Sequence, residues 1–403
     1  MTNLTLAIRA LPARAGALRS SWFWKDILAP FLLTRLAWVL AAFYAVGNYQ
    51  PNPTYLEFAR RGYQFSKYFL IDIWAHWDAR FYLSIIKDGY QMQGQLGDKF
   101  TNLAFFPLYP YLVKALTWLA WGWTGEKVND SLTLLVGIIL SNLLFLAGMA
   151  FLYRLATRHL ALNPIAVKRA LGLIFAFPVA FIFSCFYTES LYFFLTLAAF
   201  SAALERRWMW AGLCAGLVSL ARVQGILAAF ALLIIYLQNR EWKLSAIRAD
   251  VLWLGLSPLL LGAHLFNLYR LTGSFLAPFA AQAAWGRGQY NFFDGLRIQL
   301  EAPVLDVYKI DAVLVLLFIA CGIYILWKWP VKAFGIYTLL MVIIPISTGM
   351  LISASRFLLV VFPVFLLLGE KLKEKEGYEF ARILGFALQV VYFAGWVNYY
   401  WIV

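Results

Sequence analysis

Charged residues are scarce in this chain of 403 residues, and their scarcity excludes an ordinary soluble fold. Asp, Glu, Lys and Arg make up 13% of the sequence, whereas hydrophobic residues make up 63%. A soluble core has no room for so many apolar side chains, so lipid must be the main solvent of the protein. The sequence therefore predicts an all-α polytopic membrane protein, built as a single transmembrane domain over residues 1–403.

Cysteine is also rare, and the few cysteines exclude two further classes of site. Cys185, Cys214 and Cys321 lie far apart in apolar segments, which argues against a disulfide framework and against a zinc site. His159 and His264 add no ligand cluster. No Gly-rich phosphate loop of the Walker type is present. We therefore expect no nucleotide site and no obligatory cofactor, and a divalent metal stays an open alternative.

The net charge of +14 does not by itself indicate that the protein binds nucleic acid. The basic residues are scattered between apolar stretches and form no stripe, so nucleic acid is not an expected partner. The first 25 residues hold Arg9, Arg14, Arg19 and Lys25 without an acid. Such a segment is either an organellar transit peptide or a cytoplasmic flank, and the apolar span that follows at once favours the flank.

Apolar runs bounded by charged breaks predict about eleven membrane crossings. They cover residues 27–47, 131–153, 170–186, 188–204, 209–221, 223–238, 250–269, 310–327, 333–350, 356–369 and 379–400. The short loops then place Arg154, Arg158, Lys168, Arg169, Arg206, Arg207, Arg240, Lys243, Arg248, Lys328, Lys332, Lys371, Lys373 and Lys375 on one side. Because cytoplasmic loops retain Lys and Arg, the long loops 48–130 and 270–309 are predicted to face the extracytoplasmic side.

One apolar segment in the first loop, residues 102–123, is long enough to be a further span. Pro107 and Pro110 interrupt its start, and its many aromatic residues suit a helix lying in the membrane interface. We expect an interfacial helix there. The alternative, a twelfth crossing, would invert the orientation of everything that follows.

The same loop holds the strongest candidate for chemistry, Asp78. Trp74, Trp77, Phe81 and Ile85 recur at helical spacing, which predicts one helix over residues 74–87 with Asp78 at the edge of its apolar face. A partly desolvated carboxylate is a stronger proton acceptor, so Asp78 is a candidate general base. A solvated surface acid is the alternative.

The sequence also resembles a known family. The string HWDARFYLSIIKDGY at 76–90 and the string AFFPLYPYL at 104–112 are similar to the first luminal loop of the PIG-V family, the second mannosyltransferase of GPI-anchor assembly, and its bacterial relatives. Further similar strings are YTES at 187–190, ARVQG at 221–225, LYRLTGS at 268–274 and SRF at 355–357, with Gln282, Trp285 and Arg287 between them. Together these matches extend over residues 27–370.

The resemblance implies a GT-C glycosyltransferase, a multi-span enzyme that uses a polyprenyl-phosphate sugar donor on the extracytoplasmic side. It implies that Asp78 is the base, with inversion at the anomeric carbon, whereas Asp72 and Asp88 are weaker candidates. Residues implied or suggested as substrate-binding are His76, Trp77, Arg80, Tyr90, Phe106, Tyr109, Glu189, Arg222, Gln224, Arg270, Gln282, Trp285, Arg287 and Arg356. Arginine is well suited to phosphate because its planar group binds two oxygens at once.

These expectations point to a mannosyltransferase-like enzyme of the cell envelope, in the plasma membrane of a bacterium. The expected partners are the lipid-linked donor, a lipid-linked or glycan acceptor and membrane lipids. A transporter or lipid flippase is the alternative, since charges within the membrane also mark translocation paths. It is disfavoured because no inverted repeat is visible. An inactive scaffold subunit is a third possibility that the presence of Asp78 argues against.

Overall fold

The structure, a computed structural model, describes residues 22–92, 96–97, 99–124, 129–288, 291–303, 307–349, 351 and 353–402. The described residues form helices and no strand, which confirms the predicted all-α class. The N-terminal arginines Arg9, Arg14 and Arg19 lie outside them.

Among the residues that the structure describes, five helical segments are long and apolar enough to cross a membrane. They are η1 with α2 (Phe23–Leu28 and Ala29–Asn48), α7 (Asp130–Arg158), η7 with α12 (Ala249–Gly255 and Leu256–Thr272), α15 (Val307–Lys328) and α19 (Lys375–Val397). Four shorter apolar helices accompany them: α9 (Glu189–Leu204), α10 (Trp208–Ala221), α11 (Gly225–Gln238) and α16 (Lys332–Ile346). The chain is an integral, polytopic membrane protein, although the number of eleven crossings stays a prediction.

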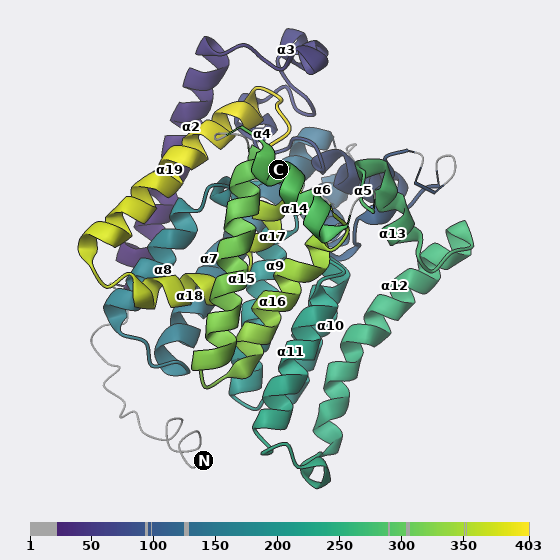
Figure 1. Cartoon of the computed structure of the whole chain (residues 1–403). Coiled ribbons are helices and arrows are strands. Elements are labelled where there is room, and N and C mark those ends of the chain that lie inside the picture. The colour runs from purple at the N-terminus through teal and green to yellow at the C-terminus, as the bar shows by residue number, and fades with distance from the viewer. Residues whose placement is uncertain are drawn as a thin grey trace.

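The two long loops meet at one end of the helix bundle (Figure 1). The first loop forms η2 (Pro53–Tyr55), α3 (Leu56–Arg61), α4 (Phe69–Asp72), α5 (Ala79–Asp88), η3 (Asn102–Ala104), α6 (Leu108–Trp121) and η4 (Gly122–Thr124). The second forms α13 (Ala277–Ala281), η8 (Gln282–Trp285) and α14 (Phe292–Glu301). Their common end agrees with the prediction that both loops face the same side of the membrane.

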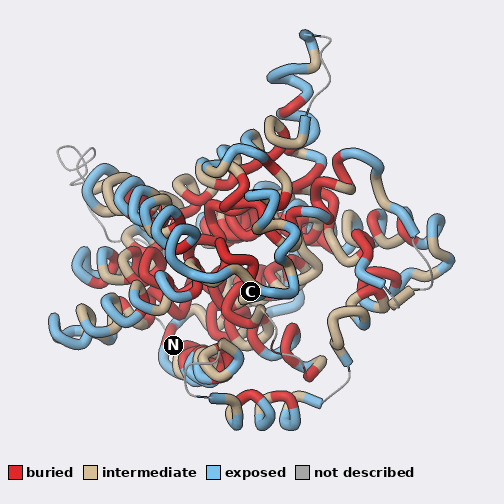
Figure 2. Tube along the Cα trace, turned by 90° about the horizontal axis from the view of Figure 1, so that it is seen from above, coloured by how far each residue is buried: buried red, intermediate tan, exposed pale blue. Residues whose placement is uncertain are grey.

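Apolar side chains line the outside of the bundle as well as its interior. Helix α9 is buried on nearly every face because it lies among α7, α10 and α11. Figure 2 shows buried residues at the centre and exposed ones around the rim. The rim is itself apolar: exposed Leu33 and Leu40 lie on α2, and exposed Phe380 and Val391 lie on α19. An apolar rim of this kind needs lipid around it.

The span predicted over residues 170–186 is wrong as a single helix. Helix α8 (Pro164–Ala176) ends one residue before Phe177, and η5 (Ala180–Ser184) follows. Pro178 has no N–H to donate, so the helix cannot continue through it. Gln389 of α19 compensates by donating to the carbonyls of Phe175 and Phe177, 3.1 and 2.7 Å away. Backbone polar groups freed inside the bundle are thus paired by protein.

The span predicted over residues 356–369 is wrong for a similar reason. The structure has two short helices, α17 (Ala354–Leu359) and α18 (Phe362–Lys371). A continuous helix would need an N–H at Pro363 to pair with the carbonyl of Leu359, and proline has none. The break leaves α17 as a separate turn of helix close to the first loop, and that turn carries Arg356.

Helix α6 begins where the prolines predicted an interruption, with Pro107 as its N-cap residue. It is 14 residues long, shorter than the roughly 20 residues that a full crossing needs. It packs against α5 of the same loop and against α7. Its position in a membrane interface stays a prediction.

Candidate active site

Asp78 lies at the start of α5, directly after a sharp turn. The helix predicted over residues 74–87 is confirmed only from Ala79 onward and is wrong before it, because α4 ends at Asp72 and Trp77 adopts a left-handed conformation with φ of 52°. The Tyr187 hydroxyl fixes this turn, because it donates to the carbonyl of His76 at 3.0 Å and accepts from the N–H of Asp78 at 3.2 Å. Contacts from a distant part of the chain therefore override the local helical pattern.

The Asp78 carboxylate is the first member of a chain of alternating charges. Arg356 donates through Nη1 to Asp78 Oδ2 at 2.7 Å and through Nε to Glu189 Oε1 at 2.8 Å. Arg222 donates to the same Glu189 oxygen at 2.7 Å. Ion pairs thus join four residues, one each from the first loop, α9, the α10–α11 turn and α17.

Glu189 is the buried centre of this chain. Its side chain is 0% exposed, and two arginines share one of its oxygens. A buried carboxylate is costly unless it is paired, so Glu189 is stable here because both guanidiniums neutralise it. Glu189, a substrate-binding candidate from the sequence, is thus occupied by ion pairs with Arg222 and Arg356.

A third arginine, Arg287, reaches the site from the second loop. It lies between Gly286 and Gly288, whose φ angles of 75° and 88° are left-handed values that favour glycine. Arg287 donates to the carbonyl of Pro345 at 3.0 Å and to Thr348 Oγ1 at 3.5 Å. The two glycines thus form a tight turn that directs Arg287 toward α16.

The surroundings of Arg287 disfavour its positive charge. Burial and the positive charges of Arg222 and Arg356 lower the pKa of Arg287 to about 10, despite the opposing effect of Asp78. Arg287 therefore stays a cation at neutral pH but is crowded by like charges. An anion bound between these arginines would relieve that repulsion.

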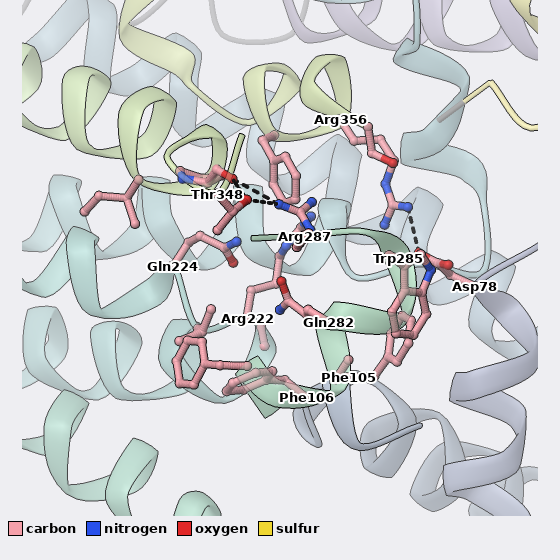
Figure 3. A pocket seen from close by; sticks show the side chains of 18 of the residues that line it. Asp78, Phe105, Phe106, Arg222, Gln224, Gln282, Trp285, Arg287, Thr348 and Arg356 are labelled. Atoms are coloured by element: carbon pink, nitrogen blue, oxygen red, sulfur yellow. Dashed lines mark hydrogen bonds and ion pairs between the residues drawn. The ribbon is translucent and has the colours of Figure 1, made fainter. Parts of the chain in front are cut away.

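These residues surround a cavity of about 460 Å³ (Figure 3). In Figure 3 the Asp78–Arg356 pair lies on one side, Gln224 and Thr348 lie on the other, and Arg287 lies between them. Three arginines and one aspartate give the lining an excess of positive charge. The rest of the wall is mainly aromatic and aliphatic: Phe105, Phe106, Val223, Ile226, Leu227, Phe279, Trp285, Ile344, Pro345, Phe357 and Trp401. The cavity thus suits a ligand with an anionic group and an apolar part.

Of the residues proposed from the sequence, about half line this cavity. These are Asp78, Phe106, Arg222, Gln224, Gln282, Trp285, Arg287 and Arg356. Glu189 lies behind the wall and pairs with two of them.

The remaining candidates lie elsewhere. Arg270 and Arg80 are exposed, and Arg80 stacks over Phe81 and Phe100. Tyr109 is buried and donates to the carbonyl of Gly137.

Tyr90, His76 and Trp77 make contacts that support the loop. The Tyr90 hydroxyl donates to the carbonyl of Phe105, and Trp77 stacks on Trp401, which itself lines the cavity. His76 is 1% exposed, with Nδ1 3.0 Å from the carbonyl of Trp396. The structure brings none of these three into the cavity lining, and a role of theirs in binding stays a prediction.

Sequence reasoning missed several residues of the lining, notably Tyr82, Thr348, Phe357 and Trp401. Tyr82 lies one helical turn after Asp78 in α5, so the helical period was a usable signal. Phe357 follows Arg356 directly, and its ring lies 4.9 Å from Arg222 and 5.4 Å from Arg287. Nothing in the sequence indicated Thr348 or Trp401.

Asp72 and Asp88, the two weaker candidates for the base, are not part of the cavity lining. Asp72 accepts hydrogen bonds from the backbone N–H groups of Gln64, Phe65 and Ser66. Asp88 is exposed at the end of α5, before the left-handed Gly89. Among the residues that the structure describes, no three His, Cys, Asp or Glu side chains are grouped as a metal site would need.

Comparison with known proteins shows which family this chain resembles. The family model described as mannosyltransferase (PIG-V) matches residues 53–266, more than half of the chain and all of the segment from α3 to Arg222. GPI mannosyltransferase 2 of Drosophila pseudoobscura pseudoobscura is 32% identical over 131 residues. That match covers 32% of this chain and 26% of the relative, so the chain aligns with only about a quarter of that protein.

Solved structures of the Archaeoglobus fulgidus oligosaccharyltransferase are also similar. One, in complex with an inhibitory peptide and a dolichol-phosphate, has a TM-score of 0.46 at 12% identity, covering 95% of this chain and 56% of the other. Another, in complex with Zn and sulfate, has a TM-score of 0.42 at 14% identity, covering 90% and 53%. TM-scores below 0.5 support no conclusion about the activity of this chain. The family match over residues 53–266 does decide the classification, and the chain belongs to the mannosyltransferase (PIG-V) family.

Proposed function

We propose that this protein transfers a hexose such as mannose from a polyprenyl-phosphate donor to a lipid-linked or glycan acceptor. The observation that carries the proposal is a cavity lined by Asp78, three arginines and a mainly apolar wall. The donor has matching parts, since it joins a sugar to an anionic phosphate and an apolar chain. In this proposal the reaction takes place on the extracytoplasmic side of a plasma membrane.

The phosphate of the donor is assigned to Arg222 and Arg287. Both line the cavity, and both lie against the ring of Phe357. Arg356 is less available because Asp78 and Glu189 already occupy its Nη1 and Nε groups. Charge-assisted bonds from guanidinium groups strengthen as the phosphate gains charge, so this arrangement would stabilise the departing phosphate more than the bound donor.

Asp78 is assigned the role of general base. An acceptor hydroxyl oxygen attacks the anomeric carbon and forms the new glycosidic bond, while its proton passes to the Asp78 carboxylate. The bond between the anomeric carbon and the phosphate oxygen breaks, and its electron pair leaves with the polyprenyl phosphate. A single displacement of this kind inverts the anomeric configuration. General-base help of this kind is typically worth about 10²–10⁴-fold in rate.

A transporter or flippase remains the competing function, and one experiment separates it from the enzyme. Purified protein is incubated with polyprenyl-phosphate mannose and a mixture of lipid and glycan acceptors. We expect free polyprenyl phosphate and mannosylated product to appear together, without any nucleotide sugar. Movement of the intact donor across a vesicle membrane, with no glycosidic bond formed, would refute the proposed transfer and favour the transporter.

A further inference from the structure

A second pocket lies at the far end of the bundle, between the C-terminal ends of α7 and α9. Helix α9 begins at Glu189 in the candidate active site and runs for 16 residues, so its end lies about 24 Å further along the axis. The pocket has a volume of about 280 Å³, well above the roughly 30 Å³ share of one water molecule. Its lining consists of Phe151, Arg154, Arg158, His159, Ser201, Glu205 and Arg207.

The lining is built mostly from one face of each helix. Phe151, Arg154 and Arg158 are separated by three and four residues on α7, which places them on the same side. Ser201 and Glu205 are separated by four residues at the end of α9. Because α7 and α9 pack along each other, these two faces meet and enclose the pocket.

The pocket has an excess of positive charge that its own acid does not neutralise. Glu205 lies 3.3 Å from Arg207 and 3.6 Å from His159. Among the described residues, no ion pair involves Arg154 or Arg158, which both line the pocket and are exposed. Three arginines therefore face one glutamate, and the site suits an anion.

A buried hydroxyl is an independent sign that the pocket binds a ligand. Ser201 is 9% exposed, lines the pocket, and its Oγ has no hydrogen-bond partner among the described residues. A buried hydroxyl without a partner is costly, and a ligand oxygen would complete it. Arginines and a serine hydroxyl together form the donor set that proteins use for phosphate.

The apolar side of the pocket favours a lipid headgroup, and not free phosphate, as the ligand. Phe151 forms one wall and packs edge-on against Phe194, with ring centroids 5.5 Å apart. Further along α7, Leu143 and Ile139 are 60% and 50% exposed on the rim of the bundle. An acyl chain can therefore lie along α7 while its headgroup phosphate enters the pocket.

We propose that this pocket binds the phosphate of an anionic phospholipid, at the membrane surface opposite the candidate active site. This assignment does not depend on the proposed transferase activity. It agrees with the predicted orientation, which places Arg154, Arg158 and Arg207 on the cytoplasmic side, where anionic lipids attract basic residues.

The test measures lipid binding to the full-length purified protein by native mass spectrometry. Phosphatidylglycerol is titrated against phosphatidylcholine for the wild type and for the double variant Arg154→Ala, Arg158→Ala. We expect each of the two arginines that line the pocket to contribute about fivefold to the affinity for the lipid phosphate, so the double variant should bind phosphatidylglycerol about 25-fold more weakly. Binding of phosphatidylcholine, which has no net charge, should change much less.

A matched control removes two charges elsewhere in the short loops assigned to the same side. Lys373 and Lys375 are exposed and are absent from the pocket lining, so Lys373→Ala with Lys375→Ala should leave the affinity within about twofold. If the double arginine variant does not fold, the single variants Arg154→Gln and Arg158→Gln should each weaken binding about fivefold.

Two results would overturn the proposal. One is an equal loss of affinity in the lysine control, because it would mean that overall charge, not this pocket, attracts the lipid. The other is displacement of phosphatidylglycerol by millimolar inorganic phosphate, because it would mean that the pocket binds a soluble anion. Retention of the lipid against phosphate, with loss only in the arginine variants, supports a phospholipid site.

Discussion

The turn at Trp77 separates two aspartates of the first loop whose surroundings are opposite. Before the turn, Asp72 is 4% exposed, and three backbone N–H groups donate to its two oxygens at 2.7–2.8 Å. After the turn, Asp78 borders a cavity and has one oxygen on Arg356. The Asp72 carboxylate therefore stabilises the loop, whereas the Asp78 carboxylate is available to a substrate. The hydrogen-bond partners of each aspartate, and not its position in the first loop, determine its role.

The substitution Asp78→Asn tests the proposed role of Asp78 as general base and should have the largest effect. It removes the proposed base but keeps the shape and a hydrogen-bond acceptor for Arg356. We expect turnover to fall about 10²–10⁴-fold, with little change in the melting temperature. Turnover is measured as polyprenyl phosphate released per folded protein. Full activity of this variant would refute the assignment of Asp78.

The substitution Asp72→Asn should affect the opposite property. An amide cannot accept all three backbone N–H groups as a carboxylate does, so we expect a loss of about 2–3 kcal/mol in the free energy of unfolding. The folded fraction should keep near-normal turnover. Denaturant titration in detergent measures the first quantity, and a stability equal to the wild type would contradict the structural role.

A third comparison sets two arginines of the second-loop region against each other. Arg287 lines the cavity, whereas Arg270 is exposed at the end of α12. The substitution Arg287→Ala should raise the KM for the donor about 10- to 100-fold, because a charge-assisted bond to phosphate is lost. Arg270→Ala is the matched control and should change the KM less than about twofold. Equal effects of both would remove Arg287 from the phosphate site.

The contribution of Asp72 to the free energy of unfolding should depend on pH in the acid range. Burial alone would raise the pKa of Asp72, but His76 and the backbone N–H donors outweigh burial and lower it below its usual 3.8. A carboxyl with a lowered pKa stabilises the fold above its usual value and loses that effect as pH falls through the folded value. The difference in unfolding free energy between wild type and Asp72→Asn should therefore be constant above about pH 4 and shrink below it.

The smallest expected effect concerns the turn itself. Tyr187→Phe removes the hydroxyl that bonds both His76 and Asp78 across the left-handed Trp77. We expect turnover to fall about threefold, because one neutral hydrogen bond is worth about 1 kcal/mol and only part of it bears on the position of Asp78. A drop as large as that of Asp78→Asn would mean that Tyr187 itself contacts the substrate.

Much of the architecture followed from the sequence because it depends on length and polarity alone. Long apolar runs predicted the membrane helices, and the basic short loops predicted that both long loops share one end. The errors fell at Trp77, at Pro178 and before Pro363. A proline was visible at two of these breaks but was outweighed by the length of the apolar run, whereas the turn at Trp77 is fixed by Tyr187, far away in the sequence.

The candidate site was predictable only in part, for a geometric reason. Short motifs indicated Asp78, Arg222 and Arg356, but they do not define how each helix is rotated about its axis. Arg270 and Arg287 illustrate this, since one lies on an exposed helix end and the other on a glycine turn directed into the cavity. Lining residues from distant segments, such as Thr348, have no local signal at all.

The oxygen of Glu189 that two arginines share has a consequence for how this family can vary. Asp78, Glu189, Arg222 and Arg356 lie on four separate elements, yet each charge is balanced by another in a setting where an unpaired charge is costly. A neutral replacement of Glu189 would leave Arg222 without its ion pair and would remove one of the two ion pairs of Arg356, whereas a neutral replacement of Asp78 leaves Arg356 paired with Glu189. In an alignment of relatives, Glu189, Arg222 and Arg356 should therefore be retained together or lost together, and a sequence that lacks one of them should lack the others as well.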